Sequence, residues 1–140
     1  MLPKIPALTY FAFRWFVRRE DGRAMPFEDL DDLGHALDAL QAARPGHPQI
    51  LYLLGLLRVR EGRHAEAIPL LEMALRASPS NVSLLVHLGN ALQALARFEE
   101  AISLYNAALN LNPGLIDALN NRGNALAALN RFDQALTDFD

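Results

Sequence analysis

The residues most able to do chemistry in this sequence are its four histidines and a few closely spaced carboxylates. The histidines are His35, His47, His64 and His87, and none stands at a metal-ligand spacing from another histidine or from an acidic cluster. We expect the pairs Glu99/Glu100 and Asp138/Asp140 to face solvent instead of taking part in acid–base catalysis. We therefore predict that the chain is not an enzyme and that it binds no metal or cofactor.

The composition is that of a single globular domain. The chain has 140 residues, of which 51% are hydrophobic and 21% are charged, so it can bury a core. The formal net charge is -3 and the chain has no cysteine, which argues against a nucleic-acid interface and excludes disulfides and Cys-type zinc sites. The sequence contains no run of 18 apolar residues, so we expect no membrane-spanning helix and a cytoplasmic location.

A repeat of 34 residues organises the chain, and Val82–Leu115 is one complete copy of it. Small residues and prolines recur at this spacing, namely Gly55, Gly89 and Gly123, then Ala67, Ala101 and Ala135, and then Pro45, Pro79 and Pro113. Such a period is the signature of a helical repeat array. Each unit is predicted to be two amphipathic helices joined by a tight turn, at Gly62-Arg63, Ala96-Arg97 and Asn130-Arg131.

We predict four segments along the chain. Residues 1–47 form an irregular N-terminal helix pair, with helices near 7–19 and 27–44, that covers the end of the array. Regular units follow at 48–81 and 82–115, and a third at 116–140 stops before its last motif positions. We therefore expect the chain to be a fragment of a longer protein.

The repeated glycines predict close packing within each unit. A glycine inside a helix costs about 1 kcal/mol relative to alanine, so a close approach of the partner helix must offset it. We expect each glycine to contact the repeated alanine of the second helix, so that Gly89→Leu disrupts the array at Ala101 and Gly89→Ala is tolerated.

The middle unit carries a complete family motif, with Leu85, Leu88, Gly89, Leu92, Ala101, Tyr105, Ala108 and Pro113 at its eight positions. The pattern resembles the tetratricopeptide repeat, and the first and third units match it except at Arg58 and Arg122. The resemblance implies an all-α fold, a right-handed superhelical solenoid of antiparallel helix pairs. It also implies a protein-interaction scaffold whose concave face, lined by the first helix of each pair, binds a peptide or protein segment.

Carried over by position, the resemblance places a set of candidate peptide-binding residues on this face. They are Tyr52, Leu56, Arg60, His87, Asn90, Asn120, Asn121 and Asn124. An asparagine can pair with any peptide backbone, because its amide both donates and accepts hydrogen bonds. The row resembles the asparagine ladder of O-linked N-acetylglucosamine transferase repeats, although only Asn121 matches the ladder position. The alternative is that Asn90 and Asn124 follow the repeat consensus and face water.

Three further hypotheses concern partners. The array could be the targeting module of a larger enzyme such as a glycosyltransferase. The aromatic and basic segment around Phe11–Arg19 could attach the protein to a membrane surface, although burial between helices suits it better. Finally, weak self-association is expected through the C-terminal end, where Leu126, Leu129, Leu136 and Phe139 would be uncovered.

Overall fold

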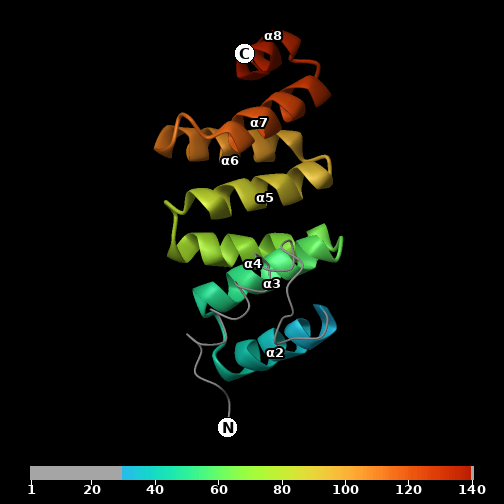
Figure 1. Ribbon diagram of the computed structural model, residues 1–140, viewed down its shortest axis with the longest axis vertical. Coiled ribbons are helices and arrows are strands. Elements are labelled where there is room, and N and C mark those ends of the chain that lie inside the picture. The colour runs from blue at the N-terminus through green and yellow to red at the C-terminus, as the bar shows by residue number, and fades with distance from the viewer. Residues whose placement is uncertain (1–29, 140) are drawn as a thin grey trace, which may run out of the picture.

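The structure, a computed structural model, describes residues 30–139, which form a stack of helices (Figure 1). The seven helices of this range are α2 (Leu30–Ala43), α3 (Pro48–Arg60), α4 (His64–Ala77), α5 (Val82–Ala94), α6 (Phe98–Leu111), α7 (Ile116–Ala128) and α8 (Phe132–Phe139). Each packs against its neighbours in sequence, and α5 also contacts α3 and α7. The predicted all-α solenoid of antiparallel helix pairs is confirmed. The predicted helix at residues 7–19 lies outside the described residues.

The helices repeat at the spacing of the sequence. The first helices α3, α5 and α7 begin at Pro48, Val82 and Ile116, and the second helices α4 and α6 begin at His64 and Phe98. The predicted unit boundaries fall in the connections between α4 and α5 and between α6 and α7. The division of the chain into units, with residues 1–47 as a cap, stays a prediction.

Helix α3 is apolar around most of its circumference because it is covered on two sides. Ile50, Leu53 and Leu57 pack with buried leucines of α2, whereas Leu51 belongs to the central core that continues through α4 to α8. A helix that is hydrophobic all round is stable in water only when it is enclosed in this way.

The turns inside the three pairs share one backbone feature. Gly62, Ala96 and Asn130 all have left-handed backbones, with φ angles of 77°, 59° and 62°. The tight turns predicted at these positions are confirmed, and each contains one left-handed residue. Glycine and asparagine adopt this conformation readily, but alanine does so at a cost of about 1–2 kcal/mol.

Ala96→Gly is therefore expected to raise the free energy of unfolding by about 1 kcal/mol, because glycine relieves the strain but adds entropy to the unfolded chain. The matched control is Gly62→Ala. A Cβ there would meet nothing within 4 Å, so only the backbone changes, and we expect a loss of about 1 kcal/mol. Urea unfolding of the two variants measures both effects. Two shifts of the same sign would contradict this account.

The close packing at the repeated glycines differs from the prediction. A Cβ on Gly89 would lie 2.7 Å from Cε1 of Tyr105, and one on Gly123 would lie 2.7 Å from Cε1 of Phe139. A Cβ on Gly55 would likewise lie 2.5 Å from Cδ2 of Leu71, and the nearest alanine atom is the backbone oxygen of Ala67, 3.6 Å away. The closest atoms at each glycine are thus not those of the repeated alanine, as the prediction had it. Each glycine instead makes room for the large side chain four residues beyond the repeated alanine.

Arg122, which departs from the repeat motif, forms an ion pair with a buried carboxylate. Its Nε donates to Oδ2 of Asp138 at 2.7 Å and its Nη2 to the other carboxylate oxygen. The Asp138 side chain is only 4% exposed, so the expectation that it faces solvent is wrong. The positions 34 residues earlier are Leu88 and Leu104, which pack in the central core. A charged pair in the third unit thus occupies two positions that are apolar in the second unit.

Candidate functional site

Two polar contacts join the first helices α3, α5 and α7. We call their four residues the first-helix row: Tyr52, His87, Asn90 and Asn121. The Tyr52 hydroxyl lies 2.9 Å from Nδ1 of His87 and so joins α3 to α5. Nδ2 of Asn121 donates to Oδ1 of Asn90 at 2.9 Å and joins α7 to α5. His87 and Asn90 are one helical turn apart, so the two contacts belong to one face.

Asn90 also holds the buried tyrosine of its own pair. The Tyr105 hydroxyl lies 2.7 Å from Oδ1 of Asn90 and 2.8 Å from Oε1 of Gln93. Because a hydroxyl has one proton, it donates to one of the two amides at a time. Burial raises the pKa of Tyr105, so the proton stays in place. Asn90 therefore supports the fold as well as the face, and the alternative in which it only faces water is wrong.

In the Tyr52–His87 contact, Nδ1 of a neutral imidazole can accept a hydrogen bond from the tyrosine hydroxyl. Burial raises the pKa of Tyr52, so its hydroxyl keeps a proton to donate to Nδ1. Burial also lowers the pKa of His87, because the charged ring loses hydration and the backbone hydrogen bond with Ser83 only partly offsets that loss. An imidazolium could not accept the Tyr52 hydrogen bond, since both of its nitrogens carry protons.

Acid is therefore expected to weaken the array through His87. The folded protein binds this proton less readily than the unfolded chain, whose histidines titrate near pH 6.5. The stability that depends on a neutral His87 is fully present above about pH 6.5. It is lost as the pH falls towards the lower pKa of the folded state, and the free energy of unfolding then changes by at most about 1.4 kcal/mol per pH unit. Urea unfolding between pH 5 and 7.5 should show this slope, and His87→Gln should flatten it. His35→Gln, a change at an exposed histidine, is the control. An unchanged slope in His87→Gln would refute the assignment.

The side chains of Leu56, Asn120 and Asn124 add no further polar contact to the row among the described residues. Leu56 is half-buried on α3, while Arg60 at the end of α3 is exposed. Asn120 and Asn124 are exposed on α7. The structure therefore brings together four of the eight predicted residues.

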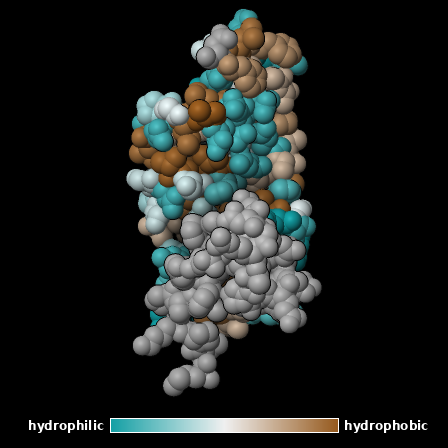
Figure 2. Space-filling model, viewed as in Figure 1, coloured by the Kyte–Doolittle hydropathy of each residue, from teal (hydrophilic) through white to brown (hydrophobic). Residues whose placement is uncertain are grey.

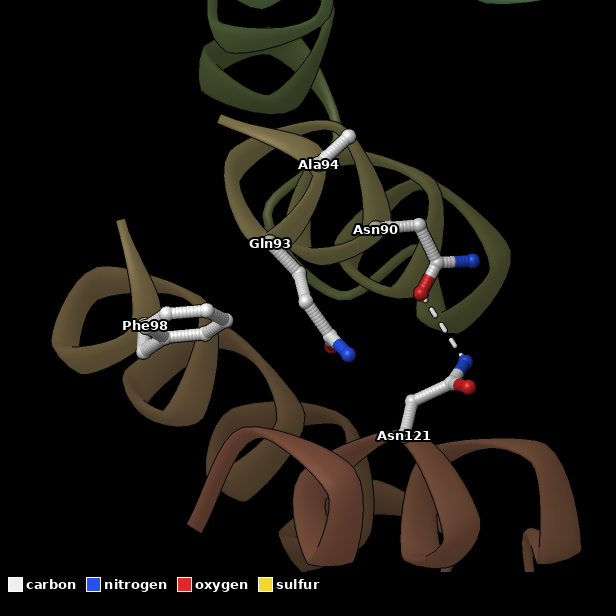
Figure 3. A pocket seen from close by; sticks show the side chains of 5 residues that line it. All are labelled: Asn90, Gln93, Ala94, Phe98 and Asn121. Carbon is white, nitrogen blue, oxygen red and sulfur yellow. Dashed lines mark hydrogen bonds between the residues drawn. The ribbon is translucent and has the colours of Figure 1, made fainter. Parts of the chain in front are cut away.

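A pocket beside the row contains residues that the sequence did not single out. It has a volume of about 430 Å³ and is lined by Asn90, Gln93, Ala94, Phe98 and Asn121 (Figure 3). We call it the amide pocket. Phe98 starts the second helix α6, so a pattern restricted to first helices could not include it. The signal available for Gln93 was its place one turn after Asn90.

Helix α8 carries an exposed apolar face at the C-terminal end. Phe132, Leu136 and Phe139 are 58%, 60% and 49% exposed and lie at helical spacing. Figure 2 shows hydrophobic residues over α8 and a second hydrophobic area near the connection of α6 to α7, where Leu111 and Ile116 are exposed. Leu126 was expected to be uncovered but is only 6% exposed, because it packs in the central core.

Self-association through this α8 face stays a prediction. We expect concentration-dependent association in sedimentation equilibrium, and Leu136→Asp should abolish it, because a buried carboxylate would oppose the contact. Phe139→Asp should do the same, although Phe139 also packs on Gly123 and its loss could loosen α8. A parent protein that stays monomeric at high concentration would end this hypothesis.

No three His, Asp or Glu side chains of residues 30–139 gather in a way that could hold a metal ion. Within the same range, no helix is both long and apolar enough to cross a membrane.

Comparisons with known proteins agree with this architecture. The family model of the tetratricopeptide repeat matches residues 58–114. The solved structure of MamA MSR-1 is 29% identical, with a TM-score of 0.74 over 79% of this chain and 63% of that chain. A mutant of MamA is 26% identical with a TM-score of 0.79, covering 95% of this chain and 72% of that one. MamA from Desulfovibrio magneticus RS-1 is 20% identical, with a TM-score of 0.79 over 94% of this chain and 71% of that one, and so shows the fold alone.

None of the curated proteins is similar enough to count as a match. The chain spans less than two thirds of the length of MamA MSR-1, at 63%.

A stack of antiparallel helix pairs with a row of side chains along its first helices defines a helical-repeat scaffold for protein interactions. Residues 58–114 match the tetratricopeptide repeat, and the chain is similar to the MamA structures beyond that range.

Proposed function

We propose that the protein binds an extended peptide or protein segment on the concave face formed by α3, α5 and α7. The observation that supports this most is the arrangement of free amide groups along the first-helix row. Oδ1 of Asn90 accepts hydrogen bonds from Asn121 and Tyr105, which leaves Nδ2 of Asn90 and Oδ1 of Asn121 without partners in the described chain. One donor beside one acceptor matches the N–H and C=O groups of a peptide backbone.

The remaining candidate residues extend the same surface. Asn120 and Asn124 offer exposed amides on α7, and Leu56 and Tyr52 offer apolar contact area on α3. Arg60 lies at the end of α3 and supplies a positive charge at the edge. The proposed face is therefore more apolar near α3 and richer in amides near α7, and a bound segment would be oriented by this difference.

Selection from a phage library of random decapeptides tests the proposal. We expect the protein to enrich peptides, and the double variant Leu56→Arg/Asn124→Arg to lose them, because two long cations would block the face. The matched control is Met73→Arg/Ser103→Arg, which places the same charges at exposed positions of the second helices α4 and α6. Equal loss of binding in both double variants, or no enrichment by the parent, would overturn the proposal.

The alternatives from the sequence stay predictions. The role as a targeting module of a larger enzyme such as a glycosyltransferase rests on sequence resemblance alone. Membrane attachment through the aromatic and basic segment concerns residues outside the described range. Co-sedimentation of the protein with liposomes, with and without residues 1–23, tests it: equal binding by both forms would refute membrane attachment. The cytoplasmic location likewise stays a prediction.

A further inference from the structure

The amide pocket combines three side-chain amides with one aromatic ring and no charged lining residue. It lies where the end of α5, the start of α6 and the middle of α7 meet, and Gln93 reaches between Phe98 and the Asn90–Asn121 pair (Figure 3). Because these residues come from three helices that pack on one another, their relative positions are set by the core.

The hydrogen-bonding groups of the pocket are only partly used within the protein. Asn90 and Asn121 share one hydrogen bond of 2.9 Å, and Asn90 and Gln93 each lie within hydrogen-bonding distance of the Tyr105 hydroxyl. Within residues 30–139, each of the three amides therefore keeps one end without a partner. The free groups include the donor Nδ2 of Asn90 and the acceptor Oδ1 of Asn121.

Three classes of side chain can be compared as occupants. A charged group would lose hydration without meeting an opposite charge on the pocket wall. An aliphatic group would leave amide groups desolvated and unpaired. A carboxamide avoids both penalties, because it donates and accepts hydrogen bonds, is uncharged, and has a planar face that can lie against the Phe98 ring.

We propose that the amide pocket binds a glutamine or asparagine side chain of the bound segment. The inference rests on the proposed function and adds the residue preference at one position. The pocket should reject glutamate as well as favour glutamine, since glutamate has the shape of glutamine but carries a charge and no amide donor.

The test uses pools of seven-residue peptides, acetylated and amidated, with a fixed central residue and random flanks. The central residue is Gln, Asn, Glu, Lys or Leu. Binding is measured by NMR titration, through the side-chain NH2 signals of Asn90, Gln93 and Asn121. We expect the Gln or Asn pool to bind about tenfold more tightly than the Glu, Lys and Leu pools, because each of the latter leaves a half-buried amide of the pocket unpaired.

A pair of variants assigns the preference to the pocket. Gln93→Met keeps the length of the side chain without its amide and should remove most of the preference for the Gln or Asn pool. Gln134→Met, the same change at an exposed position of α8, should leave it intact.

The outcomes separate the two proposals. Equal affinity for all pools, or a preference that survives Gln93→Met, overturns this inference and leaves the proposed peptide face standing. Signals that respond to N-acetylglucosamine but not to the Gln or Asn pool would assign the pocket to a glycan and also overturn it. No binding of any pool to α3, α5 or α7 would refute both proposals.

Discussion

Gly89→Leu is expected to lower the free energy of unfolding by about 3 kcal/mol, at the upper end of what overpacking usually costs. Even the first carbon of the new side chain would lie 2.7 Å from Cε1 and 3.1 Å from Cδ1 of Tyr105. The Tyr105 side chain is fully buried, and its hydroxyl is held by Asn90 and Gln93. The ring therefore cannot turn aside, and α5 and α6 must separate. Urea and thermal unfolding measure the loss.

A pair of alanine variants isolates the rigidity of the ring. Gly123→Ala places a Cβ at the same 2.7 Å from Cε1 of Phe139, but Phe139 is 49% exposed and can move outwards. We expect Gly123→Ala to be neutral or slightly stabilising, since alanine gains up to about 1 kcal/mol of helix propensity. We expect Gly89→Ala to be destabilising by about 1–2 kcal/mol. This reverses the sequence-based expectation that Gly89→Ala is tolerated. Equal effects of the two alanines would show that the ring environment does not matter.

Arg122→Leu is expected to cost about 3 kcal/mol, or to detach α8 from α7. The substitution leaves the carboxylate of Asp138 buried without its partner, and breaking a buried pair from one side typically costs about 3–5 kcal/mol. We take the lower end, because α8 is the last helix described and can separate from α7 without unfolding the rest. Hydrogen exchange of the α8 amides distinguishes local detachment from global unfolding.

The double variant Arg122→Leu/Asp138→Leu tests the cause. It places leucines at both positions, as Leu88 and Leu104 of the central core do in the preceding unit, so the stability should return to within about 1 kcal/mol of the parent or exceed it. The hydrogen bond from Arg122 to Asn106 is lost in both variants, but it is exposed and contributes little. A double variant as unstable as Arg122→Leu alone would contradict the explanation.

The elements of the fold were predictable because their signals are local. Helix amphipathicity, the prolines Pro79 and Pro113 after the second helices, and the turn residues Gly62 and Asn130 each act within a few residues. The 34-residue period then predicted stacked pairs, since one pair cannot bury both of its apolar faces. Ala96 is the exception among the turns. Its position in the 34-residue repeat predicts the turn, whereas alanine itself disfavours a φ of 59°.

For the candidate site, the sequence could predict only which residues share the face of the first helices. Residue spacing places Tyr52, His87, Asn90 and Asn121 on first helices, but it does not say that Tyr52 bonds to His87 or Asn121 to Asn90. These contacts join residues 31 and 35 positions apart, and they depend on how the pairs are rotated against each other. The amide pocket was beyond prediction for the same reason, since Phe98 enters it from a second helix.

The sequence by itself determined the helical repeat, the family and the small residue at each close approach. Only the tertiary structure decided what fills the space at the repeated glycines, that Asp138 is buried beside Arg122, and that Asn90 serves both the core and the exposed row. The physical reason is that periodicity reports which residues share a face of a helix, whereas packing depends on the rotation and distance between helices. Those quantities are set jointly by all the side chains at an interface and have no signature at any single position.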